Sequence, residues 1–241
     1  MKKLAVILVV LAALGAAGLY WAWHSLDVIV KAAIEHFGPD MAGVPVTVRD
    51  VKLSATDGKG SLKGVEIGNP PGFAARRAAR LGEMRVAVDP LTVRESLVVI
   101  REIAIEAPEI TYEKGAKATN LEVIQKNIEN YVARTVGSSE SQAAAPKGLE
   151  RRYVIEKLSI RAARVTMTNP ALKGQGVTFT LPDIELRGIG KRPNGVTSAQ
   201  AANVVVAAIT TRIAQRVLTN IELLRKGGKE GALDALRGIL K

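Results

Sequence analysis

The sequence predicts an α+β protein in which an N-terminal transmembrane helix precedes a mostly antiparallel sheet that two or three helices cover. Three observations predict it: an uncharged stretch at residues 4–23, a two-residue periodicity that begins at Val44, and two long stretches of helical periodicity. The chain has 241 residues and 47% of them are hydrophobic, which is ample material for a core.

The stretch at 4–23 carries no charged side chain and, as a helix, would cross the roughly 30 Å apolar layer of a bilayer. Lys2 and Lys3 precede it, which predicts a cytoplasmic start, and aromatic residues at 20–23 favour the headgroup region at its other end. The alternative is a signal peptide cleaved between Ala13 and Ala17. We therefore expect a single-pass protein of the bacterial inner membrane, with an anchor at 1–24 and its body in the periplasm.

Three stretches have the periodicity of helices. Residues 25–37 form a short amphipathic pattern that we expect to end at Gly38-Pro39. Longer patterns at 119–135 and 197–225 repeat apolar side chains, such as Val206 and Ile209, at spacings of three or four. These patterns predict two substantial helices.

A segment at 137–149, which contains "GSSESQAAAPKG", has the composition of a linker or mobile loop. It divides the body into a half at 25–136 and a second β-repeat with C-terminal helices at 150–241. The sequence leaves open whether this segment separates two domains or decorates one.

Four segments between turn signals alternate apolar and polar residues, as half-buried antiparallel strands do. They read "VPVTVRDVKLS", "GSLKGVEIG", "EMRVAVD" and "LVVIREIAIEAPEITYE". With the strands of the second half, about eight strands at about 4.8 Å spacing would span about 40 Å.

The last of these segments is repeated. Residues 99–112 align without gaps on residues 154–167, an offset of 154 − 99 = 55, and five of fourteen positions are identical. Both copies change the phase of their apolar residues, which predicts a β-bulge or bend at the Ala-Pro and Ala-Ala steps. Charges reverse sign between the copies at Arg101/Glu156, Glu102/Lys157, Glu106/Arg161 and Glu109/Arg164. The reversal indicates either drift on solvated positions or equivalent faces that meet in a stack or dimer.

The sequence offers little for catalysis or metal binding. It contains no cysteine and only two histidines, and the glycines of "GKGSLKG" at 58–64 fit a hairpin turn better than a phosphate-binding loop. We therefore expect no enzyme, no cofactor and no metal site. The net charge is +11, and the basic region at 191–241 contains no aromatic residue, which favours a membrane surface over nucleic acid as the partner.

A family resemblance covers about residues 1–131. "GSLKGVEIGNPPGF", "AARLGEMRVAVD", "LVVIREIAIEAPEITYEKG" and "TNLEVIQKNI", in this order, resemble the N-terminal region of AsmA-like proteins. The matching residues are Gly64, Ile67, Asn69, Pro70, Gly72, Phe73, Leu81, Val86, Asp89, Pro108, Tyr112, Asn120 and Leu121. In that family a short helical link follows the Asn-Pro-x-Gly-Phe turn.

The resemblance implies that the sheet is curved and of β-groove type, in a periplasmic, membrane-anchored relative of the bridge-like lipid-transfer proteins. Such a protein binds or helps transport phospholipid through an apolar β-groove. Candidate groove residues are Val86, Val88, Ile103, Ile105, Leu158, Ile160, Phe179 and Leu181. Their alternative role is to form the core beneath the two long helices. Candidate headgroup or membrane-surface residues are Arg212, Arg216, Arg225, Lys226 and Lys229, whose alternative role is an ordinary solvated helix face. The alternative function is a non-enzymatic cell-envelope scaffold or assembly factor that binds a protein partner or forms a homo-oligomer.

Overall fold

The computed structural model describes residues 26–54, 56–137, 151–168 and 176–226, with side chains except at 136–137 and 218–226. The predicted membrane segment at 4–23, its signal-peptide alternative and nearly all of the predicted linker lie outside these residues. Among the described helices, none combines the length and the apolar character that a bilayer crossing requires.

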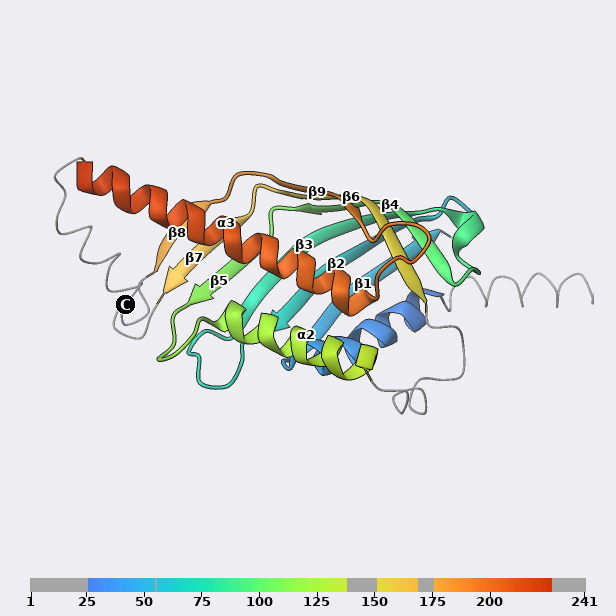
Figure 1. Ribbon diagram of the computed structural model, residues 1–241, viewed down its shortest axis with the longest axis horizontal. Helices are drawn as coiled ribbons and strands as arrows, with labels where there is room; N and C mark the ends of the chain where they lie inside the picture. The colour runs from blue at the N-terminus through green and yellow to red at the C-terminus, as the bar shows by residue number, and fades with distance from the viewer. Residues whose placement is uncertain (1–25, 55, 138–150, 169–175, 227–241) are drawn as a thin grey trace, which may run out of the picture.

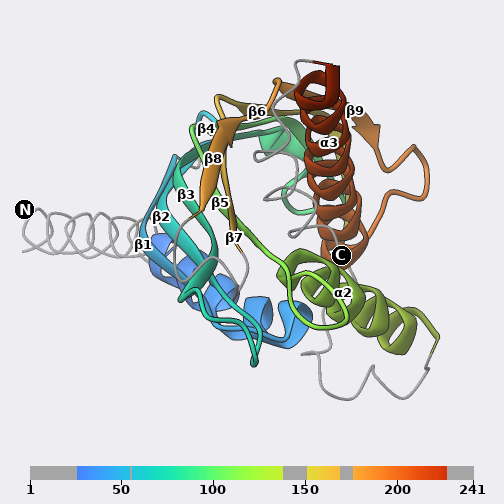
Figure 2. The same cartoon turned by 90° about the vertical axis from the view of Figure 1, so that its left-hand side faces the viewer.

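The described residues form a mixed α+β fold, with one curled, half-barrel sheet and three α-helices (Figure 1 and Figure 2). The strands are β1 (Val46–Ser54), β2 (Lys59–Gly68), β3 (Arg77–Val88), β4 (Leu97–Glu106), β5 (Glu109–Glu113), β6 (Arg152–Arg161), β7 (Arg164–Thr168), β8 (Val177–Thr180) and β9 (Ile184–Ile189). The helices are one over residues 26–42, the 3-10 turn η1 (Pro90–Thr92), α2 (Asn120–Gly137) and α3 (Ser198–Lys226). Strands from both sides of the predicted linker therefore belong to one sheet.

The nine strands follow six paths across the sheet, because β4 continues into β5, β6 into β7 and β8 into β9 after short interruptions (9 − 3 = 6). Their order is β1, β2, β3, β4/β5, β6/β7 and β9/β8. All neighbouring paths are antiparallel except β4/β5 and β6/β7, which run parallel. Six paths leave five intervals, or about 24 Å at about 4.8 Å each, so the groove length of 40 Å expected from eight strands is wrong.

The predicted change of phase within the repeated strands is confirmed. Ala107 and Ala162 have φ angles of 46° and 50°, and each stands between two strands of one path. Ile105 and Ile110 consequently both enter the main buried cluster, although an odd spacing in a straight strand would put them on opposite faces. Gly64, with φ of 63°, marks a similar bend in β2, and the sheet curls at these points.

The sequence offset of 55 is the register of the parallel pairing. Ile103 lies opposite Leu158, Ile105 opposite Ile160, and Glu109 opposite Arg164. Three of the four sign reversals are ion pairs across this pairing: Glu102–Lys157 at 3.0 Å, Glu106–Arg161 at 3.9 Å and Glu109–Arg164 at 2.6 Å. The repeats therefore meet as adjacent strands within one chain, and the charges need neither drift nor a second chain to explain them.

We expect Arg164→Glu to lower the free energy of unfolding by about 0.5–1 kcal/mol, because it places two carboxylates opposite each other at an exposed position. Adding Glu109→Arg restores the opposite charges and most of the loss. Urea denaturation of the two single variants and the double variant measures this coupling. A double variant as unstable as the sum of its singles would show that the pair does not form in solution.

The helix at 26–42 does not end at Gly38-Pro39 as predicted but continues to residue 42. A Cβ atom at position 38 would lie 2.9 Å from Cβ of Val46, so glycine there lets the helix approach β1 closely. The amide of Gly43 donates to the carbonyl of Pro39 at 2.8 Å and closes the last turn. Packing against the sheet therefore outweighs the weak helix propensity of this dipeptide.

The same helix covers the outer edge of β1. The carboxylate of Asp27 accepts from the amide of Leu53 at 2.8 Å, and that of Glu35 accepts from the amide of Val48 at 3.0 Å. These bonds satisfy amide groups that an edge strand would otherwise leave open.

The short helical link implied by the resemblance is absent, because β3 already begins at Arg77. Arg77 and Arg80 both form ion pairs with Glu66 on the neighbouring strand, at 2.7 Å and 3.6 Å, while Ala78 is fully buried. This alternation of charged and buried residues favours a strand. The predicted helices at 119–135 and 197–225 are confirmed as α2 and α3.

Candidate functional site

The predicted groove residues lie mostly in the packed core. Ile105, Leu158, Ile160 and Leu181 have exposed fractions between 1% and 7% and belong to the main buried cluster. This cluster also contains Leu121, Ile124 and Ile128 of α2, and Ile213 and Val217 of α3. The two helices thus fill the space above these four residues, which are core residues as in the alternative that the sequence left open.

The other four predicted groove residues are only partly buried. Ile103 and Phe179 pack against the main cluster. Val86 packs against a second cluster, beneath the helix at 26–42, while Val88 lies opposite Ile100. The structure therefore brings Ile103 and Phe179 to the border of the core but places Val86 elsewhere.

Partly buried apolar side chains pack against the main cluster from most elements of the fold, and six of the larger ones lie on β4, β9 and the first half of α3. We call this set the apolar strip: Ile100, Ile103, Leu186, Val205, Val206 and Ile209. Further along α3, Ile213 is 0% exposed and Val217 is 2% exposed. One face of α3 is thus sealed at Ile213 and Val217 although the residues between them are exposed, whereas residues 205–210 are all partly buried. The helix lies on the open side of the curled sheet (Figure 2).

The sequence identified only part of this strip. Helical periodicity placed Val206 and Ile209 on an apolar face, and strand alternation did the same for Ile103. Neither pattern shows which strand a helix covers, so Ile100, Leu186 and Val205 were missed.

The structure describes the side chains of two of the five predicted headgroup residues. Arg212 and Arg216 are exposed on α3, immediately beyond the apolar strip. Arg225 and Lys226 belong to the backbone of α3, but their side chains, and all of Lys229, lie outside the described residues.

Two of the residues that carry the family resemblance, Asn69 and Asn120, belong to a buried polar network centred on Glu113. The carboxylate of Glu113, 1% exposed, accepts from Asn69 Nδ2 at 3.0 Å and from the amides of Ala74 and Ala75 at 2.6 Å and 2.9 Å. These bonds hold the turn after β2 against the end of β5. The turn that follows "GVEIG" is therefore a docking point for another strand.

Asn120, fully buried at the start of α2, completes the network. Its Nδ2 donates to Asn69 Oδ1 and to the carbonyl of Thr111, both at 2.8 Å. Its Oδ1 accepts from the amides of Glu113 and Leu121, both at 2.9 Å. Every polar atom of this side chain is satisfied, which indicates a structural role.

Next to this network, burial raises the pKa of Tyr112, and the negative charge of Glu122 raises it further. The phenol is therefore neutral at physiological pH. Within the described residues, no group of three or more His, Asp or Glu side chains is placed to hold a metal ion.

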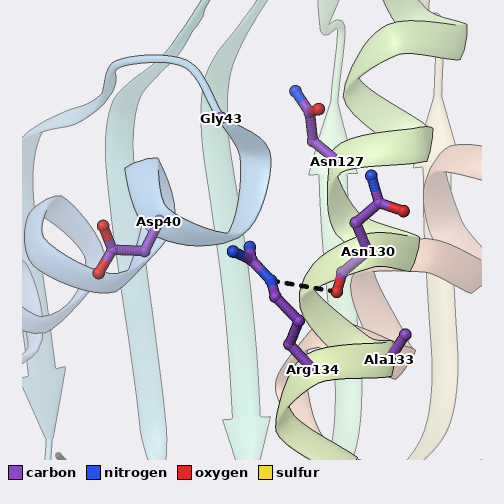
Figure 3. A pocket seen from close by; sticks show the side chains of 6 residues that line it. All are labelled: Asp40, Gly43, Asn127, Asn130, Ala133 and Arg134. Carbon is purple, nitrogen blue, oxygen red and sulfur yellow. Dashed lines mark hydrogen bonds between the residues drawn. The ribbon is translucent and has the colours of Figure 1, made fainter.

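A polar cavity of about 480 Å³ lies between the end of the helix at 26–42 and α2 (Figure 3). It is lined by Asp40, Gly43, Asn127, Asn130, Ala133 and Arg134. Asn127 Nδ2 donates to the carbonyl of Ala42 at 3.0 Å, and Arg134 Nε donates to the carbonyl of Asn130 at 3.3 Å. Gly43, with φ of 68°, passes so close to Asn127 that a Cβ there would lie 2.4 Å from its Nδ2. These contacts join the two helices.

Comparison of the chain with protein-family models and with curated proteins finds no match.

Proposed function

We propose that this protein is anchored in the inner membrane, faces the periplasm, and binds or helps transport phospholipid. An acyl chain lies against the apolar strip while its headgroup stays in water. The observation that carries the proposal is the partial exposure of the strip: apolar side chains on β4, β9 and α3 keep accessible surface beside a fully packed core. Accessible apolar surface of this kind is typical of ligand sites.

Two further features support the proposal. Arg212 and Arg216 follow the strip along α3, where they can hold a phosphate group while the chain lies beside Ile209. The other feature is the resemblance of residues 1–131 to AsmA-like proteins, and two of the residues that carry it, Asn69 and Asn120, are bonded to each other.

The test compares two substitutions at adjacent positions of α3. Val205 is a partly buried member of the strip, while Val204 is 43% exposed. We expect the full chain, purified in mild detergent, to carry phospholipid in native mass spectrometry. Val205→Glu should lose most of it, because a carboxylate is costly beside an acyl chain, and Val204→Glu should retain it. Circular dichroism confirms that both variants remain folded.

An unsubstituted chain free of lipid would contradict the proposal, as would equal loss of lipid in both variants. The second result would show that the carboxylate acts through helix stability and not through the strip.

A second candidate function is an envelope scaffold that binds a protein partner. It is favoured by the outer edge of β8 and β9, which pairs with no other described strand and offers backbone groups to a partner strand. In this case the purified chain carries a stoichiometric protein in place of lipid, and proline at Glu185 or Arg187, in β9, disrupts that complex.

A further inference from the structure

One end of the molecule exposes several large apolar side chains. Leu91 is 86% exposed and Val93 is 40% exposed, at the turn η1 between β3 and β4. At the start of the helix at 26–42, Leu26 is 36%, Val28 67% and Ile29 58% exposed. These five residues, which we call the apolar end, account for most of the large exposed apolar side chains in the described part of the chain.

Hydrogen bonds show that the two segments of the apolar end lie on either side of one hairpin. The start of the helix is bonded to the end of strand β1, where the amide of Leu53 donates to the carboxylate of Asp27. The hairpin that follows is bonded to the end of β3, where the amide of Val88 donates to the carbonyl of Gly58 at 2.6 Å. The hairpin thus lies between the helix and η1, at the end of the sheet where β4 begins (Figure 1).

Leu91 is held in its exposed position by a well-bonded turn. The Asp89 carboxylate accepts from the amide of Leu91 at 3.2 Å and pairs with Arg101 at 3.2 Å. The hydroxyl of Thr92 donates to the carbonyl of Asp89 and accepts from the amide of Val99, both at 2.9 Å. The hydrogen bond from Arg101, followed by that from Leu91, lowers the pKa of Asp89, so this cap stays ionised at neutral pH.

The charged side chains around the apolar end are mainly basic. Lys59 and Arg94 are exposed beside η1, and exposed Lys191 and Arg192 reach the same end, where the charge of Arg192 acts on Asp89. The exposed acidic groups there are Asp57 and Glu95. An apolar projection within a basic rim suits a surface of anionic lipid headgroups.

The sequence supports the same partner. The uncharged stretch ends at residue 23, and the residues that the structure describes begin at Leu26. A membrane segment in that stretch would hold the apolar end within a few residues of the bilayer surface. No other end of the molecule would be held so close.

We propose that the apolar end is a second membrane contact, in which Leu91 and its neighbours insert shallowly into an anionic phospholipid leaflet while Lys59, Arg94 and Arg192 contact the headgroups. This inference rests on the membrane anchorage in the proposed function, but not on the binding of lipid to the apolar strip. With two points of contact, the sheet has a fixed orientation on the membrane.

Because the chain has no cysteine, a single one can report the depth of any exposed position. Leu91→Cys tests the contact, and Val177→Cys, 46% exposed on β8 at the opposite end, is the matched control (Figure 1). Each full-length variant carries an environment-sensitive fluorophore and is reconstituted into vesicles of phosphatidylcholine and phosphatidylglycerol with brominated acyl chains. We expect the label at 91 to shift to the blue and lose most of its fluorescence to bromine quenching, and the label at 177 to do neither.

Three outcomes would overturn part of this picture, and they are distinguishable. Labels at 91 and 177 that both stay unquenched on vesicles that float with the protein refute the second contact and leave the anchor intact. Protein that does not float with the vesicles refutes the anchor. Equal quenching at 91 in vesicles of phosphatidylcholine alone refutes the role of the basic rim. Lipid in the apolar strip is measured separately, by native mass spectrometry.

Discussion

Asn120→Ala is expected to lower the free energy of unfolding by about 2–4 kcal/mol, one of the two largest effects that we predict. The substitution leaves the amide of Glu113 and the carbonyl of Thr111 buried without their partner, and removes the bond to Asn69. The turn after β2, the end of β5 and the start of α2 lose their common link. Urea denaturation measured by circular dichroism gives the loss.

The control is Asn130→Ala, on the same helix. Asn130 is exposed, and the one bond described for it uses its backbone carbonyl, so the side chain should contribute less than about 0.5 kcal/mol. Alanine is a better helix former than asparagine, so propensity cannot explain a loss. A similar loss from both variants would mean that the network contributes no more than an exposed position of α2.

Ile160→Glu is expected to prevent folding. Ile160 is 1% exposed and pairs with Ile105 and Ile184 inside the main cluster. An unpaired carboxylate there costs more than about 4–5 kcal/mol, a large part of the stability of an ordinary domain. Near-ultraviolet circular dichroism and thermal denaturation of the full chain report the loss.

Val177→Glu, at an exposed position of β8, is the matched control and should fold normally. A folded Ile160→Glu variant would contradict the packed core that we describe. It would show that α2 and α3 leave water access to the centre of the sheet, as an open groove requires.

The bends and the pairing of the sheet could be predicted only in part. The phase change after Ile105 and Ile160 is visible in the sequence because each residue alternates with charged neighbours up to the bend. The parallel pairing of the two copies is not visible, since an alternating pattern specifies faces and not neighbours. The opposite charges of Glu109 and Arg164 were the signal for this pairing in the sequence, because the two side chains form an ion pair between neighbouring strands.

Predictions from local helix propensity were wrong at two places where tertiary packing determines the secondary structure. Gly38-Pro39 is a strong stop signal, yet the helix continues because β1 lies against it. The residues from Arg77 to Leu81 resemble a helix in their alanine and arginine content, yet ion pairs with Glu66 and the burial of Ala78 place them in a strand.

The sequence predicted which face of each strand holds apolar residues, but not which of those residues stay accessible. Ile103 and Ile160 have the same alternation in sequence, but Ile103 belongs to the apolar strip and Ile160 is sealed beneath the helices. Leu91 belongs to a three-residue turn that has no periodicity at all, so only the fold could reveal its exposure.

The two edges of the sheet differ in what they allow. At one edge, Asp27 and Glu35 occupy amide groups of β1, and no further strand can add there without displacing the helix. At the other edge, β9 and β8 present their outer backbone groups. Inside that edge, β6/β7, which repeats the sequence of β4/β5, pairs directly with β4/β5. A chain that duplicated this bent unit again would lengthen in one direction only. Further strands could therefore add at the β8/β9 edge but not at the β1 edge, so the two edges of the sheet are not equivalent.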